Sequence, residues 1–135
     1  MNKNFSWDIR VYFEDTDAGG VVYYANYLRY LERARSEWLR ALGFDQRKLM
    51  AETGLGFAVR SIAAEYLKPA RLDDELRVVC GIKMLGRAQV VFDQRIERGE
   101  DTLLTATVRL ACMDLARGKA AAVPPEIYEQ FAKLT

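Results

Sequence analysis

The chain has 135 residues, half of them hydrophobic and 29% charged, which fits one globular domain spanning residues 1–135. Its 20 basic and 19 acidic side chains leave a net charge of +1, which excludes a bulk electrostatic attraction to nucleic acid or to a membrane. There is no histidine, which excludes Ser-His-Asp triads, Cys-His pairs and most catalytic zinc sites, so acid–base chemistry has to come from carboxylate, tyrosine, lysine or cysteine side chains.

No segment of the sequence indicates export or membrane insertion. The N-terminal residues MNKNFSWDIR contain no apolar run suited to a signal peptide, and no stretch approaches about 18 apolar residues. Cys80 and Cys112 both fall in strand-like runs, where we expect reduced, buried thiols. These features favour a cytoplasmic protein without a metal site, a cofactor or a nucleic-acid partner.

The first half of the chain predicts one strand followed by a long helix. Residues 7–13 alternate apolar and polar side chains, which is typical of a strand. From residue 24 to residue 42 the spacing of apolar residues changes to three and four, which predicts an amphipathic helix of about five turns. The apolar stripe of this helix consists of Tyr27, Leu31, Ala34, Trp38 and Ala41.

The rest of the chain predicts a sheet between two short helices. A helix is expected over residues 45–52, with Asp45 as its N-cap, and another over residues 126–133 after Pro124-Pro125. Four consecutive strand-like runs lie between them, at residues 57–67, 75–85, 88–98 and 102–114. Consecutive strands with short connections favour an antiparallel sheet. The sequence therefore predicts an α+β protein with the hotdog fold, in which a five-stranded antiparallel sheet wraps around one long helix.

The segment EDTDAGGVVYYANY, residues 14–27, has more polar and aromatic character than a plain connection requires. Glycines before a helix start favour free backbone N–H groups at a partially positive helix end, which stabilise an anion or a developing oxyanion. Asp17 can face that point as a nucleophile or general base. The alternative is purely structural, with residues 15–17 forming an Asx-turn and Gly19-Gly20 a bend. Glu32 on the helix lies about 12 Å from its start, too far to share a reacting atom.

Several stretches together carry a family resemblance. Residues 11–23 read VYFEDTDAGGVVY and lead into Ala25-Asn26-Tyr27 and Glu32-Arg33-Ala34-Arg35. Similar stretches continue at Val59-Arg60-Ser61, Glu65-Tyr66, residues 69–74 and residues 94–96. Over nearly its whole length the chain resembles the 4-hydroxybenzoyl-CoA thioesterase family, and most closely its YbgC-type branch of acyl-CoA thioesterases, often associated with the Tol-Pal system.

The resemblance implies a hotdog fold and the hydrolysis of an acyl-CoA to a free acid and CoA. It implies that Asp17 is the catalytic carboxylate and that the backbone amide of Tyr24 polarises the thioester carbonyl. The YbgC-type branch usually has histidine where this chain has Tyr24, and the hydroxybenzoyl branch has tyrosine. The backbone amide can polarise the carbonyl with either residue at this position, whereas proton transfer by an imidazole requires histidine.

Further expectations concern binding and assembly. Substrate contacts are expected from the loop and from basic residues that meet the CoA phosphates, namely Gly19, Gly20, Val21, Arg60, Lys68, Arg71 and Arg87. The resemblance implies a homodimer with its sites at the subunit interface, and a homotetramer built as a dimer of dimers. The alternative function is a non-catalytic module that binds acyl-CoA or acyl carrier protein, against which the presence of Asp17 argues.

Overall fold

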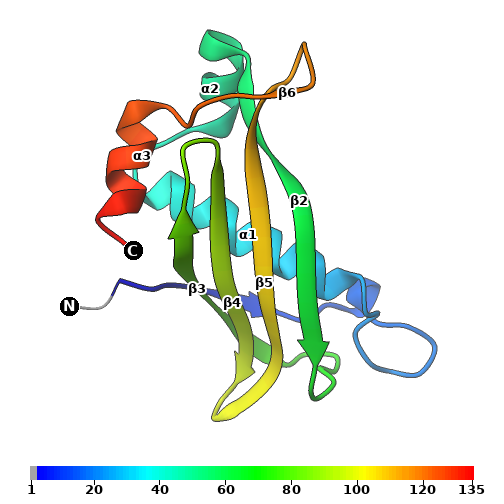
Figure 1. The fold of residues 1–135 in the computed structure, drawn as a ribbon. Helices are drawn as coiled ribbons and strands as arrows, with labels where there is room; N and C mark the ends of the chain where they lie inside the picture. The colour runs from blue at the N-terminus through cyan, green and yellow to red at the C-terminus, as the bar shows by residue number, and fades with distance from the viewer. Residues whose placement is uncertain (1–2) are drawn as a thin grey trace.

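The computed structural model describes residues 3–135 and consists of a curled antiparallel sheet with three α-helices (Figure 1). The strands are β1 (Phe5–Arg10), β2 (Leu55–Tyr66), β3 (Glu75–Leu85), β4 (Gln89–Arg98), β5 (Asp101–Asp114) and the two-residue β6 (Lys119–Ala120). The helices are α1 (Asn26–Ala41), α2 (Gln46–Thr53) and α3 (Pro125–Ala132), and a single 3-10 turn covers Phe13–Asp15. The predicted hotdog arrangement is confirmed, and β6 is an addition to the five strands expected.

The strand order is β1-β3-β4-β5-β2, and every neighbouring pair is antiparallel. The long helix α1 crosses one face of this sheet and packs against β1, β3 and β4 (Figure 1). Strand β2 pairs with β5 on one side only, so it forms a long edge of the sheet. An edge strand presents unpaired backbone N–H and C=O groups, which a further strand can use.

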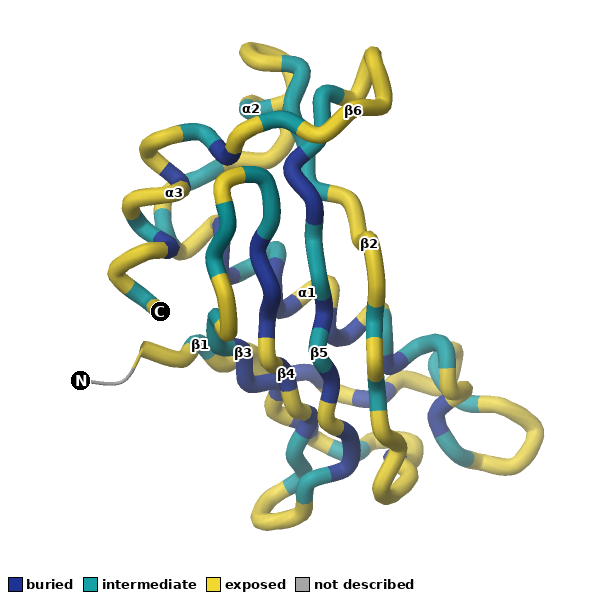
Figure 2. The backbone as a smooth tube through the Cα atoms, viewed as in Figure 1, coloured by how far each residue is buried: buried dark blue, intermediate teal, exposed yellow. Residues whose placement is uncertain are grey.

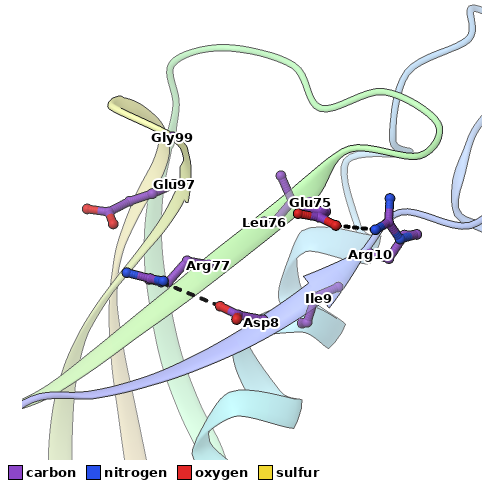
Figure 3. Close-up of a pocket in the computed structure, with 8 residues that line it drawn as sticks. All are labelled: Asp8, Ile9, Arg10, Glu75, Leu76, Arg77, Glu97 and Gly99. Atoms are coloured by element: carbon purple, nitrogen blue, oxygen red, sulfur yellow. Dashed lines mark hydrogen bonds and ion pairs between the residues drawn. The ribbon is translucent and has the colours of Figure 1, made fainter.

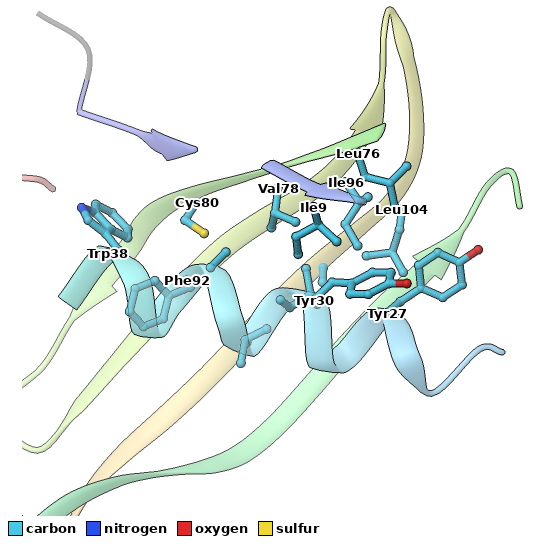
Figure 4. Close-up of a cluster of buried hydrophobic side chains, with 14 of the residues drawn as sticks. Ile9, Tyr27, Tyr30, Trp38, Leu76, Val78, Cys80, Phe92, Ile96 and Leu104 are labelled. Carbon is cyan, nitrogen blue, oxygen red and sulfur yellow. The ribbon is translucent and has the colours of Figure 1, made fainter. Parts of the chain in front are cut away.

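The buried face of α1 holds the core together (Figures 2 and 4). Four of the five stripe residues expected on the helix are buried, and Tyr30, Arg35 and Leu39 widen the buried face. Ala41 is exposed, contrary to the prediction, because it is the last residue of the helix. The helix packs on sheet residues that include Ile9, Val78 and Ile96. Each large aliphatic side chain buried in this way contributes about 1.5–3 kcal/mol to the free energy of folding.

Two element boundaries near the proposed site differ from the prediction. β1 ends at Arg10, and the chain turns at residues 13–15, which leaves Phe13 79% exposed although the alternating pattern placed it on the apolar face of a strand. The side chain of Asp15 accepts a hydrogen bond from the Tyr12 N–H at 2.8 Å and stabilises this turn. Helix α1 begins at Asn26, two residues later than predicted.

Candidate active site

The loop between β1 and α1 contains a small closed turn. Thr16 and Val22 form an antiparallel bridge, and the Asp17 N–H donates to the Val21 carbonyl at 2.9 Å. The Gly20 N–H donates to the Asp17 carbonyl at 3.0 Å, with a φ of 79° at Gly20. A side chain would strain the backbone at that φ, which explains the second glycine of the pair.

The carboxylate of Asp17 lies on the exposed surface of this turn. Its Oδ1 atom accepts a hydrogen bond from the Gly19 N–H at 2.8 Å, which makes an Asx-turn of residues 17–19, two residues later than the structural alternative placed one. Both glycine N–H groups therefore bond to Asp17, and the expectation that they are free to bind an anion is wrong. The Oδ2 atom of Asp17 accepts no hydrogen bond within residues 3–135, so it is accessible to a ligand.

The free N–H groups lie instead at the turn that leads into α1. Ala25 is the N-cap and gives no side-chain cap, because alanine has no acceptor. In the described part of the chain, the N–H groups of Tyr24 and Ala25 donate to no protein acceptor, whereas that of Asn26 bonds to the Tyr23 carbonyl at 2.8 Å. The positive end of the helix dipole adds to the two free donors. Tyr24 precedes the helix instead of opening it, yet its amide is unbonded, as the proposed role requires.

Two side chains that the sequence analysis did not assign hold this turn in place. The Tyr66 hydroxyl, at the end of β2, donates to the Tyr24 carbonyl at 3.0 Å, and the two rings meet edge to face with centroids 6.4 Å apart. Burial raises the pKa of Tyr66, so the hydroxyl keeps its proton at neutral pH. The Asn26 side chain donates to the Asp15 carbonyl at 2.9 Å and ties the helix to the loop. Both residues lie in the stretches that carry the family resemblance, and that was the only signal for them.

Asp15 is a structural residue of the turn. Its side chain accepts from Tyr12, and its carbonyl accepts from both the Tyr23 N–H at 3.0 Å and the Asn26 side chain. The Tyr30 hydroxyl is buried beneath this loop without a hydrogen-bond partner in residues 3–135, and its pKa is raised by burial and then by the Asp15 carboxylate. Asp15 therefore connects the loop to the start of the helix.

The four basic residues expected to meet CoA do not gather in one protomer. Arg71 lies against the loop, because it forms a backbone bridge with Val21. Lys68 is paired with Asp101 at 3.0 Å. Arg60 is exposed at a β-bulge of β2, and Arg87 is exposed in the β3–β4 hairpin.

The hairpin of Arg87 lies at the other end of the sheet (Figure 1). On β5, Leu104 pairs with the last residue of β2 and Ala111 pairs with the first residue of β4. The seven residue steps from 104 to 111 span about 24 Å. Arg87 is therefore remote from the Asp17 loop of the same protomer.

One hollow of about 450 Å³ lies over β1, β3 and the β4–β5 turn (Figure 3). Four of its five charged side chains are paired across the strands, Arg10 with Glu75 and Arg77 with Asp8, the latter at 3.4 Å. Such exposed pairs are screened by solvent and contribute little energy. The hollow includes none of the candidate site residues.

A second cavity, of about 250 Å³, lies between α1 and the sheet face next to β2. Most of its wall is apolar, and Phe57 and Val59 supply the part on β2. Val59 is 51% exposed, so the cavity reaches the open edge of the sheet. Neither Asp17 nor Tyr24 lines this cavity in a single protomer.

Comparisons with known proteins identify relatives of this chain in sequence and in structure. The family model for the thioesterase-like superfamily matches residues 11–131. The chain is 45% identical over 134 residues to the acyl-CoA thioesterase YbgC of Haemophilus influenzae, covering 99% of this chain and 98% of that protein. It is 48% identical over 128 residues to the acyl-CoA thioester hydrolase YbgC of Escherichia coli, covering 94% and 95%. A probable thioesterase from Bartonella henselae has a crystal structure that superposes with a TM-score of 0.86 at 37% identity, covering 90% and 99%.

Proposed function

The chain belongs to the thioesterase-like superfamily, and we propose that the Asp17 loop and the turn into α1 form the site at which it hydrolyses acyl-CoA thioesters. The expectation of an acyl-CoA thioesterase related to YbgC is confirmed by these relatives. The roles given below to single residues are our proposal. The observation that supports them most directly is a solvent-accessible carboxylate and two unbonded backbone N–H groups within one short segment.

In the proposed reaction the thioester carbonyl oxygen accepts a hydrogen bond from the Tyr24 N–H. Negative charge develops on that oxygen in the transition state, and the N–H at the helix end stabilises it. As general base, the free oxygen of Asp17 takes a proton from a water molecule that attacks the carbonyl carbon; the C–S bond breaks, the acyl carbon keeps the water oxygen, and the sulfur of CoA leaves and takes up the proton. As nucleophile, Asp17 attacks the carbonyl carbon itself, the C–S bond breaks to give an acyl–aspartyl anhydride and the CoA thiolate, and water then hydrolyses the anhydride to the free acid, restores the Asp17 carboxylate and supplies the proton taken up by the sulfur. Gly19, Gly20 and Val21 allow the thioester to approach the loop closely.

A second copy of the chain supplies the wall that the loop lacks. Strand β2 is an open edge, and the turn at Tyr24 is fastened to its last residue, Tyr66. If two β2 strands pair antiparallel about a two-fold axis, the Tyr66 end of one lies beside the Leu55 end of the other. The cavity bordered by Phe57 and Val59 of the partner subunit then opens next to Tyr24. We infer a homodimer on this geometry; a tetramer of two dimers stays a prediction.

The same pairing supports a role for two of the basic residues in binding the phosphates of CoA. Arg71 approaches the site from its own protomer, and the partner subunit's Arg87 approaches from the far end of its sheet. Lys68 contributes less, because Asp101 already neutralises its charge. Arg60 lies on the pairing edge itself. Among residues 3–135, none of the helices has the length and apolar character of a membrane span. The cytoplasmic location and the acyl carrier protein partner stay predictions.

The proposal is tested by measuring thiol release from a panel of acyl-CoA substrates with the wild-type protein and with Asp17→Asn. We expect turnover by the wild type and a loss of at least about 10²-fold in the variant, the usual effect of removing a catalytic base. Binding of acyl-CoA without thiol release by the wild type would favour the non-catalytic module. Equal turnover by both proteins would show that Asp17 is neither the nucleophile nor the general base.

A further inference from the structure

An arginine side chain is buried in the wall of the 250 Å³ cavity. Arg35 lies in the middle of α1 and is only 8% exposed, although a guanidinium is among the groups least often buried. Its Nη1 atom donates to the Gln94 side chain at 2.9 Å. It forms no ion pair with a carboxylate in the part of the chain that the structure describes. Burial lowers the pKa of Arg35, yet a guanidinium stays charged at neutral pH.

Gln94 holds this guanidinium in a fixed position. Its side-chain nitrogen donates to the Leu31 carbonyl at 3.0 Å and contacts the Cys80 sulfur at 3.0 Å. Burial raises the pKa of the Cys80 thiol to about 11, so Cys80 is neutral and offers Arg35 no counter-charge. Both partners of the amide are themselves part of the core, on α1 and β3. The network orients the arginine and leaves its charge uncompensated.

The cavity also contains an acid, but it does not neutralise Arg35. Glu32 lies one turn before Arg35 and lines the same cavity. Its side chain is exposed, and its carboxylate lies beyond the 4.0 Å limit of an ion pair with Arg35. Solvent therefore screens the attraction between them. An unpaired guanidinium in a mostly apolar wall is costly, unless a ligand supplies an acceptor.

We propose that this cavity takes the acyl group of the substrate and that Arg35 binds an oxygen acceptor at the far end of that group. This inference rests on the proposed function, because the thioester has to lie at the Tyr24 turn of the partner subunit. The cavity has a volume of about 250 Å³, which suits a compact acyl group. Leu39, Val90 and Phe131 contact the apolar part of the acyl group, and the guanidinium contacts the distal oxygen.

The specificity is tested with three series of CoA thioesters of matched length: plain alkyl, terminal hydroxyl and terminal carboxylate. We expect the wild-type kcat/KM to be at least about 10-fold higher for one oxygen-bearing series than for the plain alkyl series, the effect of one charge-assisted hydrogen bond. The hydroxyl and carboxylate arms distinguish the two sources of the acceptor. A plain alkyl series hydrolysed equally well or better overturns the inference and leaves the proposed function standing.

Two variants of α1 assign the preference to Arg35. In Arg35→Met we expect the ratio between the oxygen-bearing and plain series to fall to about one. Arg33→Met is the matched control, since Arg33 is exposed on the same helix and does not line the cavity, and it should keep the wild-type ratio. An unchanged ratio in folded Arg35→Met overturns the assignment. If that variant does not fold, the wild-type series still decides the inference.

Discussion

The hydroxyl of Tyr66 donates a hydrogen bond to the backbone carbonyl of Tyr24, across 42 positions of sequence. This contact fastens the turn before α1, with its unbonded N–H groups, to the last residue of the open edge strand. The position of the proposed oxyanion donor therefore depends on the same strand that we propose as the dimer interface. Site geometry and assembly are linked through one side chain.

Replacing Tyr66 by phenylalanine should loosen that link. Tyr66→Phe keeps the ring contact with Tyr24 and removes only the hydroxyl, so the free energy of unfolding should fall by about 1 kcal/mol, the usual contribution of one hydrogen bond. We expect kcat to fall several-fold with little change in KM, because the Tyr24 amide is less well positioned. Tyr128→Phe, on α3, is the matched control and should leave both unchanged. Equal kcat values in wild type and Tyr66→Phe would show that the hydrogen bond between Tyr66 and Tyr24 has no role in catalysis.

The amide of Tyr24 is tested by comparing two substitutions. Tyr24→Phe retains the backbone N–H and should keep most of the activity, because the phenol has no part in the proposed chemistry. Tyr24→Pro removes the donor and should lower kcat by about 10²–10³-fold, as for loss of one oxyanion donor. Circular dichroism checks that the helix survives. A large loss of activity in Tyr24→Phe would instead give the hydroxyl a chemical role.

The two neighbouring aspartates should respond differently to amide substitution. Asp15→Asn weakens the charge-assisted bond from the Tyr12 N–H, so thermal unfolding should occur at a lower temperature while kcat falls only slightly. Asp17→Asn should behave in the opposite way, with kcat lost and stability close to the wild type, since the amide oxygen of asparagine can still accept the local hydrogen bond from the Gly19 N–H. Measuring Tm and kcat on both variants distinguishes them. A catalytic defect in Asp15→Asn that exceeds that of Asp17→Asn would exchange the two roles.

The sequence predicted most of the fold because apolar periodicity reports directly on burial. It predicted α1 within two residues at its start, and the antiparallel order of the strands followed from their short connections. It missed the turn at residues 13–15. The alternation of apolar and polar side chains continues through Tyr12 and Phe13, but the hydrogen bond from the Tyr12 N–H to the Asp15 side chain stabilises a turn there. Local spacing also placed the free N–H groups on the glycines, since it does not reveal that Asp17 binds them. The Arg35–Gln94 contact joins α1 to β4 across 59 positions, and only the fold brings such residues together.

Arg87 tests where the nucleotide end of CoA lies. An exposed contact to a phosphate contributes equally to the ground state and the transition state, so Arg87→Ala should raise KM and leave kcat nearly unchanged. The effect should shrink as salt is added and disappear with a truncated thioester that lacks the nucleotide. Arg117→Ala is a matched control, because Arg117 is also exposed in a turn. An unchanged KM for acyl-CoA at low salt would show that Arg87 is only solvated.

The last prediction concerns the sharing of one site between two subunits, which mixed dimers test directly. Asp17→Asn removes the carboxylate and leaves the cavity intact, whereas Leu110→Trp fills the cavity from β5 and leaves the loop and the β2 edge intact. Each variant alone should be inactive.

When the two variants are unfolded and refolded together, about half of the dimers contain one copy of each, and each of these has one site with both Asp17 and an open cavity. Thiol release should therefore recover to about one quarter of the wild-type rate. A mixture of Asp17→Asn with Asp17→Ala is the control and should stay inactive. If native mass spectrometry detects mixed dimers and the first mixture is still inactive, the loop and the cavity do not act across the interface, because a site contained within one subunit cannot be restored by its partner.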